Sequence, residues 1–149
     1  MSKRLMRAIL ALAVAGLTIG VAMAGAQSSK NEFDATMKGS NESPKGPAKA
    51  SGTFHVEFKN GQACYRMSVR ALGAKPIAAH IHSAVRGKAG NVVVPLKQPN
   101  TGNGGVSAAC VNAARDVVSA IKASPAKFYV NVHTSDFPGG AIRGQLAAR

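Results

Sequence analysis

The chain is poor in acidic and aromatic residues, and both shortages limit what it can do. Aspartate and glutamate together number 6 in 149 residues, and aromatic residues make up 5%. So few carboxylates, spread along the chain, offer no paired acid and base for glycoside hydrolysis. So few aromatic rings offer no stacking platform for nucleic acid, and the lysines and arginines are scattered and form no stripe. These shortages argue against nucleic acid as a partner.

Signatures of other enzyme classes are also missing. The glycines of residues 87–90 lack the Walker spacing, because His82 stands where the first glycine would fall. Ser135 and Asp136 lie close to His133, but nothing around them marks a nucleophile elbow or an oxyanion hole. The sequence therefore indicates no catalytic residue. A metal-dependent redox activity is the only enzyme hypothesis that it leaves.

The first 26 residues have the composition of a secretory signal peptide. A basic start and an uncharged apolar run over residues 8–21 precede small residues that suit cleavage after Ala26. The run is too short and wrongly flanked for a spanning helix, and an uncleaved N-terminal anchor is the alternative interpretation. We expect one domain over residues 27–149, exported to the periplasm or the medium, with no transmembrane segment after cleavage.

Without this leader the chain is strongly basic. Three of the 19 lysines and arginines lie in the leader, which leaves 16 against 6 acidic residues and a net charge of +10. A charge of this sign favours an anionic envelope component, such as a polymer or lipid head groups. Because the charges are scattered, we interpret them mainly as a solvated basic surface.

The two cysteines of the chain are expected to form a disulfide. Cys64 and Cys110 both follow the leader, and an even pair in an exported protein is normally oxidised. They are too far apart for a redox Cys-x-x-Cys motif, and oxidation excludes free-thiol catalysis. We assign the pair a structural role.

Alternating apolar and polar residues predict a series of short strands. The clearest covers residues 54–59, and Asn60-Gly61 directly after it is a strong hairpin signal. Many short strands, Gly/Pro-rich turns and one short helix predict an antiparallel β-sandwich or barrel. The remaining strands are expected over residues 33–38, 64–71, 77–82, 92–96, 106–111, 128–133 and 142–146, with an amphipathic helix over 114–121.

The polar face of a C-terminal hairpin, residues 128–146, holds several candidate binding residues. Tyr129, Asn131 and His133 alternate with apolar residues on the first arm, so their side chains share one face. Arg143 lies on the polar side of the returning arm. We expect this face to carry the function of the protein.

Three histidines support a metal hypothesis. His80 and His82 lie two residues apart on a predicted strand, so their imidazoles project to one face. If this strand neighbours the strand of His133, the three rings converge and form a copper or zinc site with an open position. His55 lies on what looks like an exposed face and is left out. The alternative is that the histidines are ordinary polar residues of a strand face, with no cofactor.

Several motifs occur together in a recognisable order. They are the Gly-x-x-Glu-x-Pro pattern of Gly39, Glu42 and Pro44; Ala79-His80-Ile81-His82 before a Gly-rich turn and Val92-Val93-Val94-Pro95-Leu96; Tyr129-Val130-Asn131-Val132-His133-Thr134; and Gly140-Ala141-Ile142-Arg143-Gly144-Gln145-Leu146. This series resembles the CHRD domain family over nearly all of the chain after the leader. The family is named for the secreted animal protein chordin and includes small exported bacterial proteins. The resemblance implies an immunoglobulin-like or superoxide-dismutase-like β-sandwich with one short helix.

The resemblance implies little about activity, because the bacterial members have no settled function. Growth-factor binding belongs to the animal proteins and is not transferred to this chain. Our first hypothesis is an exported, non-catalytic module that binds a partner protein or an envelope component through its polar sheet face. The residues of that face are Tyr129, Asn131, His133, His80, His82 and Arg143. The alternative is a copper- or zinc-binding protein, remotely like superoxide dismutase, with His80, His82 and His133 as ligands.

The chain departs from the family pattern at one position. Ala141 stands where many members have glutamate in Gly-Glu-Ile-Arg-Gly. The acidic group next to Arg143 is therefore missing, and any ion pair between the two is in doubt. From the residues alone, we expect Asp136 to pair with Arg143 across the turn.

Overall fold

The computed structural model describes residues 31–149, so the predicted signal peptide lies outside the described residues. The strands are β1 (Glu32–Lys38), β2 (Ser51–Lys59), β3 (Gln62–Arg70), β4 (Pro76–Ser83), β5 (Asn91–Leu96), β6 (Gly105–Asn112), β7 (Phe128–Thr134), β8 (Ile142–Gln145) and β9 (Ala147–Ala148). The helices are α1 (Arg115–Ala123) and two 3-10 turns, η1 (Gly39–Asn41) and η2 (Pro125–Lys127).

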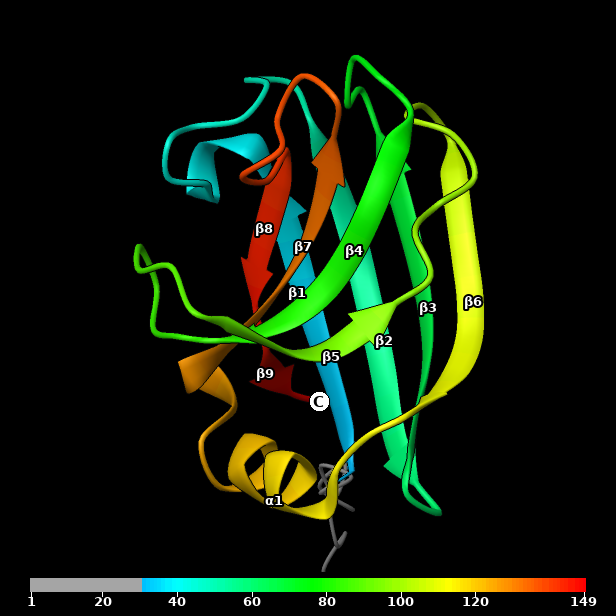
Figure 1. Cartoon of the computed structure of the whole chain (residues 1–149), viewed down its shortest axis with the longest axis vertical. Coiled ribbons are helices and arrows are strands. Elements are labelled where there is room, and N and C mark those ends of the chain that lie inside the picture. Colours follow the sequence, from blue (N-terminus) through cyan, green and yellow to red (C-terminus); the bar gives the residue numbers. More distant parts are fainter. Residues whose placement is uncertain (1–30) are drawn as a thin grey trace, which may run out of the picture.

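The strands form one antiparallel sheet that folds over into two layers (Figure 1). Its order is β5-β4-β7-β8-β1-β2-β3-β6, with β9 beside β1. The sheet turns between β8 and β1, where the ladder consists of a single residue pair, Lys38 with Arg143. The predicted all-β antiparallel fold with one short α-helix is confirmed.

The predicted hairpin at Asn60-Gly61 joins β2 to β3. Both turn residues have positive φ, 51° for Asn60 and 75° for Gly61. A two-residue turn of this kind matches the right-handed twist of the flanking strands. The ladder closes directly at Lys59 opposite Gln62, which fixes the register of the hairpin.

The hydrophobic core lies between the two layers. Phe33, Phe54 and Met67 point inward from β1, β2 and β3, and they are buried with Ile81 of β4 and Val130 of β7. The short helix α1 covers one end of the layers (Figure 1), as its amphipathic pattern predicts. Because the core lies on one face of β4, β7 and β8, the polar residues of these strands occupy the opposite, outer face.

A disulfide joins Cys64 on β3 to Cys110 on β6, which confirms the predicted pairing. No helix in residues 31–149 is long and apolar enough to cross a membrane.

Removing this disulfide should destabilise the domain. The bridge closes a loop with a sequence separation of 46 residues, so the chain-entropy model gives a loss of about 4 kcal/mol in unfolding free energy. We expect the double variant Cys64→Ala/Cys110→Ala to show this loss in urea unfolding. The wild-type protein unfolded under reducing conditions is the control and should lose a similar amount. A loss below about 1 kcal/mol in both would contradict a structural role.

Candidate functional site

The strand register brings the candidate residues together on the outer face of β4, β7 and β8. His80 pairs with Asn131 and His82 with Tyr129 across β4 and β7. Arg143 of β8 pairs with Asn131 from the other side. The condition set by the sequence, that the His-x-His strand neighbours the strand of His133, is therefore met.

This face is polar but not open to solvent. Tyr129, Asn131 and Arg143 are 2%, 1% and 4% exposed, and His82 is also buried. Only His80 and His133 retain partial exposure. The strand pattern places these residues on the outer face correctly, but their burial means that a docking partner cannot reach Tyr129, Asn131 or Arg143 in this arrangement.

Two segments cover this outer face. One is the connection between β4 and β5, residues 84–90. Its backbone carbonyls accept hydrogen bonds from three side chains of the strand face. These bonds are Gln145 Nε2 to Ala84 O at 2.7 Å, Arg143 Nη1 to Lys88 O at 2.9 Å and His82 Nδ1 to Gly90 O at 2.8 Å. The connection is thus held by the residues that it covers.

The other covering segment is the connection between β1 and β2, residues 39–50, and Arg143 holds it in place. The guanidinium forms an ion pair with Glu42, with Nη2 2.6 Å and Nε 2.8 Å from Oε2. Asn41 Nδ2 donates to the backbone carbonyl of Arg143 at 3.0 Å. The expected pair between Arg143 and Asp136 is wrong, because Asp136 lies in the exposed turn and accepts from the hydroxyl of Ser135.

Glu42 is a buried carboxylate whose hydrogen bonds are incomplete. Burial raises its pKa, although the hydrogen bond and the charge of Arg143 act in the opposite direction. Its Oε1 is buried and has no hydrogen-bond partner in residues 31–149. Gly140, with φ of 135°, lies so close that a Cβ there would overlap the Glu42 carboxylate. Glu42 of the Gly-x-x-Glu-x-Pro motif and the glycine before Ala141 therefore meet at one ion pair.

Arg143 is connected to the histidines by stacked rings. Its guanidinium carbon lies 4.1 Å from the ring centroid of Tyr129, within the range of a cation–π contact. The other ring in the stack is His82, 4.8 Å from Tyr129 between centroids and parallel to it within 1°. The stack fixes the plane of the His82 imidazole.

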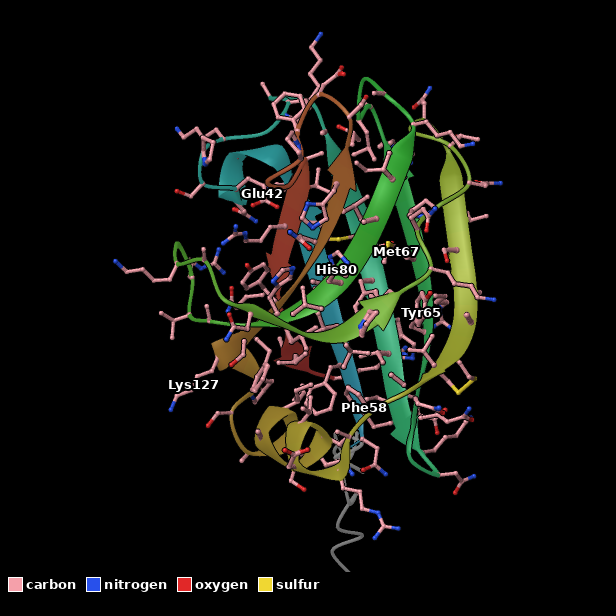
Figure 2. All side chains as sticks on the ribbon, in the orientation of Figure 1. Glu42, Phe58, Tyr65, Met67, His80 and Lys127 are labelled. Atoms are coloured by element: carbon pink, nitrogen blue, oxygen red, sulfur yellow. A yellow bond between two sulfur atoms is a disulfide. The ribbon has the colours of Figure 1, made fainter. Side chains whose placement is uncertain are left out.

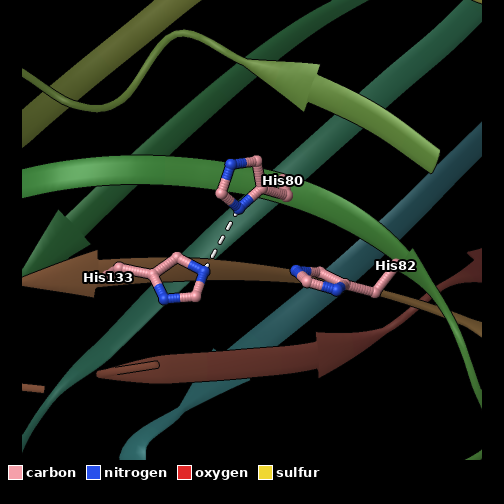
Figure 3. Close-up of side chains that lie close together, drawn as sticks. All are labelled: His80, His82 and His133. Atoms are coloured by element: carbon pink, nitrogen blue, oxygen red, sulfur yellow. Dashed lines mark hydrogen bonds between the residues drawn. The ribbon is translucent and has the colours of Figure 1, made fainter. Parts of the chain in front are cut away.

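The three imidazoles converge, as the metal hypothesis requires (Figure 3). Each offers one ring nitrogen, and these nitrogens all lie within 4.8 Å of one another. Nδ1 of His80 is 3.2 Å from Nε2 of His133. No other such group of three histidine, cysteine or acidic residues occurs in residues 31–149. His55, which the sequence left out, pairs with Asp34 in the other layer.

Hydrogen bonds to backbone carbonyls determine which ring nitrogen carries the hydrogen in His82 and His133. A backbone carbonyl can only accept, so Nδ1 of His82 donates to Gly90 and Nδ1 of His133 donates to Pro138 at 2.8 Å. In the neutral rings Nε2 then carries a lone pair. Nε2 of His133 also lies 3.0 Å from Oδ1 of Asn131, and half a turn of that amide would present its N–H group instead.

The surroundings favour neutral imidazoles. Burial lowers the pKa of His80, and the charges of His133 and His82 lower it further. Burial is also the largest cause of the lowered pKa of His82, and it outweighs the hydrogen bond to Gly90, which raises the pKa; the charges of His133 and Arg143 lower it further. Neutral imidazole is the form that binds metal ions.

The cluster fits a small transition-metal ion. Metal–nitrogen bonds of about 2.0–2.1 Å in a tetrahedron place the ligand nitrogens about 3.3 Å apart. His80 and His133 already have this separation. The widest separation, 4.8 Å, requires a closure of about 1.5 Å. A fourth position would remain for water or another ligand.

Sequence reasoning found the three histidines but missed the groups that orient them. Glu42 appeared only as part of a family motif, and the carbonyls of Gly90 and Pro138 carry no side-chain signal. Glu42 precedes Arg143 by 101 residues, a separation that no local pattern can bridge. Figure 2 labels Glu42 beside the turn after β1, at the upper left, and His80 on β4 near the middle of the view.

The buried ion pair gives a testable difference from a surface pair. Glu42→Gln leaves the guanidinium of Arg143 buried without a counter-charge, which should cost about 3–5 kcal/mol. The control is Glu32→Gln, whose carboxylate lies 3.6 Å from exposed Arg149; its loss should stay below about 1 kcal/mol. Urea unfolding of both variants measures the difference. Equal losses would contradict the role given to Glu42.

Comparison with known proteins agrees with the resemblance seen in the sequence. No curated protein and no solved structure gives a significant match. The family model described as the CHRD domain matches residues 33–146, which include every strand except β9 in whole or in part. Membership in this family supports a non-catalytic binding module in general. The chain belongs to the CHRD domain family.

Proposed function

We propose that this CHRD domain binds one transition-metal ion, copper or zinc, through His80, His82 and His133, without catalysing a reaction. The observation that carries the proposal is the buried Nε2 of His82, which has no hydrogen-bond partner in residues 31–149. Figure 3 shows this end of the ring pointing toward His133. A buried polar atom without a partner costs free energy, and a metal ion would supply the missing contact.

The chemistry of the donors agrees with this proposal. Three neutral imidazoles suit copper and zinc better than magnesium or calcium, which prefer oxygen ligands. Two of the rings are oriented by backbone carbonyls at Nδ1, a common outer contact of metal-binding histidine. Because His55 lies in the other layer, the described histidines provide one centre and no second metal or bridging imidazolate.

In this proposal a partner does not contact the polar strand face that the sequence predicted as its binding surface. Inside the domain, Arg143 holds the covering segments, Tyr129 stacks on the His82 ring and Asn131 contacts His133. A partner protein or an anionic envelope component would meet the covering segments themselves. Their exposed cations are Lys45, Lys49, Arg86 and Lys88.

The proposal includes export to the periplasm or the extracellular medium as one domain over residues 27–149. The disulfide supports an oxidising compartment. The family match supports the domain assignment. A secreted module of this kind would bind or sense metal outside the cytoplasm.

Isothermal titration of the oxidised protein with copper(II) and zinc(II) tests the metal site. We expect one ion per chain, with affinity in His82→Asn reduced by more than the roughly 10–100-fold that loss of an outer contact costs. His55→Asn is the matched control, because it removes the histidine outside the cluster, and it should bind like the wild type. The absence of binding by the wild type, or equal weakening in both variants, would overturn the proposal.

A further inference from the structure

β6 forms one edge of the sheet, and part of its backbone has no partner. The N–H and C=O groups of Val106 contact Asn100, so at this residue they point away from β3. In an antiparallel ladder this direction recurs at every second residue. The outward groups of Ala108, Cys110 and Asn112 therefore face away from the sheet, and they have no hydrogen-bond partner in residues 31–149.

This edge lacks the features that normally prevent strands from pairing between molecules. β6 contains no charged residue and no proline, and its ladder with β3 runs without a register shift. The opposite edge, β5, contains Pro95, and a bulge interrupts its pairing with β4. Natural proteins use charge, proline and bulges to protect free edges. β6 is the unprotected edge of the two, and Figure 1 shows it along the rim of the molecule.

The side chains along β6 leave room for another strand. Ala108 and Cys110 are small and exposed, and Val106 is 58% exposed. The neighbouring charged side chain on the same face is Arg66, which pairs with Ala108 from β3 and so lies one strand in from the edge. An approaching strand therefore meets no charge and no bulky group at the rim.

We propose that β6 pairs antiparallel with β6 of a second copy and so joins the two sheets across a two-fold axis. Antiparallel pairing of identical strands is self-complementary, because each outward N–H meets an outward C=O of the same row. With the axis at Cys110, this residue lies opposite itself and Ala108 lies opposite Asn112 of the second copy. The uncharged row favours an identical row over an acidic peptide, for which β6 offers no cation.

The net charge predicts how this association depends on salt. Each copy carries a formal charge of +13 with the leader and +10 without it, so two copies repel one another. Added salt screens this repulsion, whereas it would weaken the binding of an acidic strand. An edge contact buries much less surface than the roughly 1,600 Å² of a standard interface, so the dimer is expected to be weak and reversible.

Sedimentation equilibrium of the oxidised protein tests the proposal, with amide hydrogen exchange followed by NMR on the same samples. Dimer should increase with protein and with salt concentration. The amides of Ala108, Cys110 and Asn112 should become protected along with it. Ala108→Pro removes an N–H that the ladder with β3 does not use, and it should weaken association about tenfold or more because the symmetric pair loses two hydrogen bonds.

Two further variants separate an edge effect from a charge or folding effect. Ala108→Lys places a cation on the edge, and Thr36→Lys adds the same charge to the same face on β1, three strands away. Only the first should abolish the dimer. A protein that stays monomeric in high salt, or a dimer that survives Ala108→Lys and Ala108→Pro, would overturn the proposal. So would edge amides that become protected only when polyglutamate is added.

Discussion

The buried guanidinium of Arg143 is the charge around which the polar side of the domain is arranged. A charge in this position must be neutralised and hydrogen-bonded, because removing it from water without partners costs several kcal/mol. Glu42 supplies the counter-charge, the carbonyl of Lys88 accepts one further hydrogen bond, and the ring of Tyr129 covers one face of the guanidinium. The backbone of Arg143 also forms the single ladder pair that joins β8 to β1. One residue therefore connects the two layers and both covering segments.

The histidine cluster depends on this arrangement. The segment that Arg143 holds through Lys88 also presents the carbonyl of Gly90 to His82. The ring of Tyr129 lies between the guanidinium and His82 and sets the plane of the imidazole. Orientation of His82 before any ion arrives reduces the entropy that binding must overcome. The polar residues that the sequence predicted to contact a partner thus support the histidine cluster. The covering segments are the surface that a partner would contact.

The sequence was sufficient where local patterns decide the structure. Alternation predicted the strands, Asn60-Gly61 predicted a hairpin, and the spacing of His80 and His82 predicted that both rings share a face. The sequence did not predict the covering segments. Alternation shows which side of a strand is polar, but it does not show which segment lies over that side. The choice of Glu42 over Asp136 as the partner of Arg143 depends on a contact between distant segments. The unpaired half of β6 likewise follows from the strand order and not from the sequence of β6 itself.

The central claim is that the domain presents two imidazoles with Nε2 unprotonated before metal binds. Nitrogen-15 NMR of the histidine side chains in the metal-free protein at about pH 7.5, where ordinary histidine is neutral, tests it directly. We predict that His82 and His133 both carry their hydrogen on Nδ1, held by the carbonyls of Gly90 and Pro138. Freely exchanging tautomers, or a hydrogen on Nε2 of either ring, would contradict it.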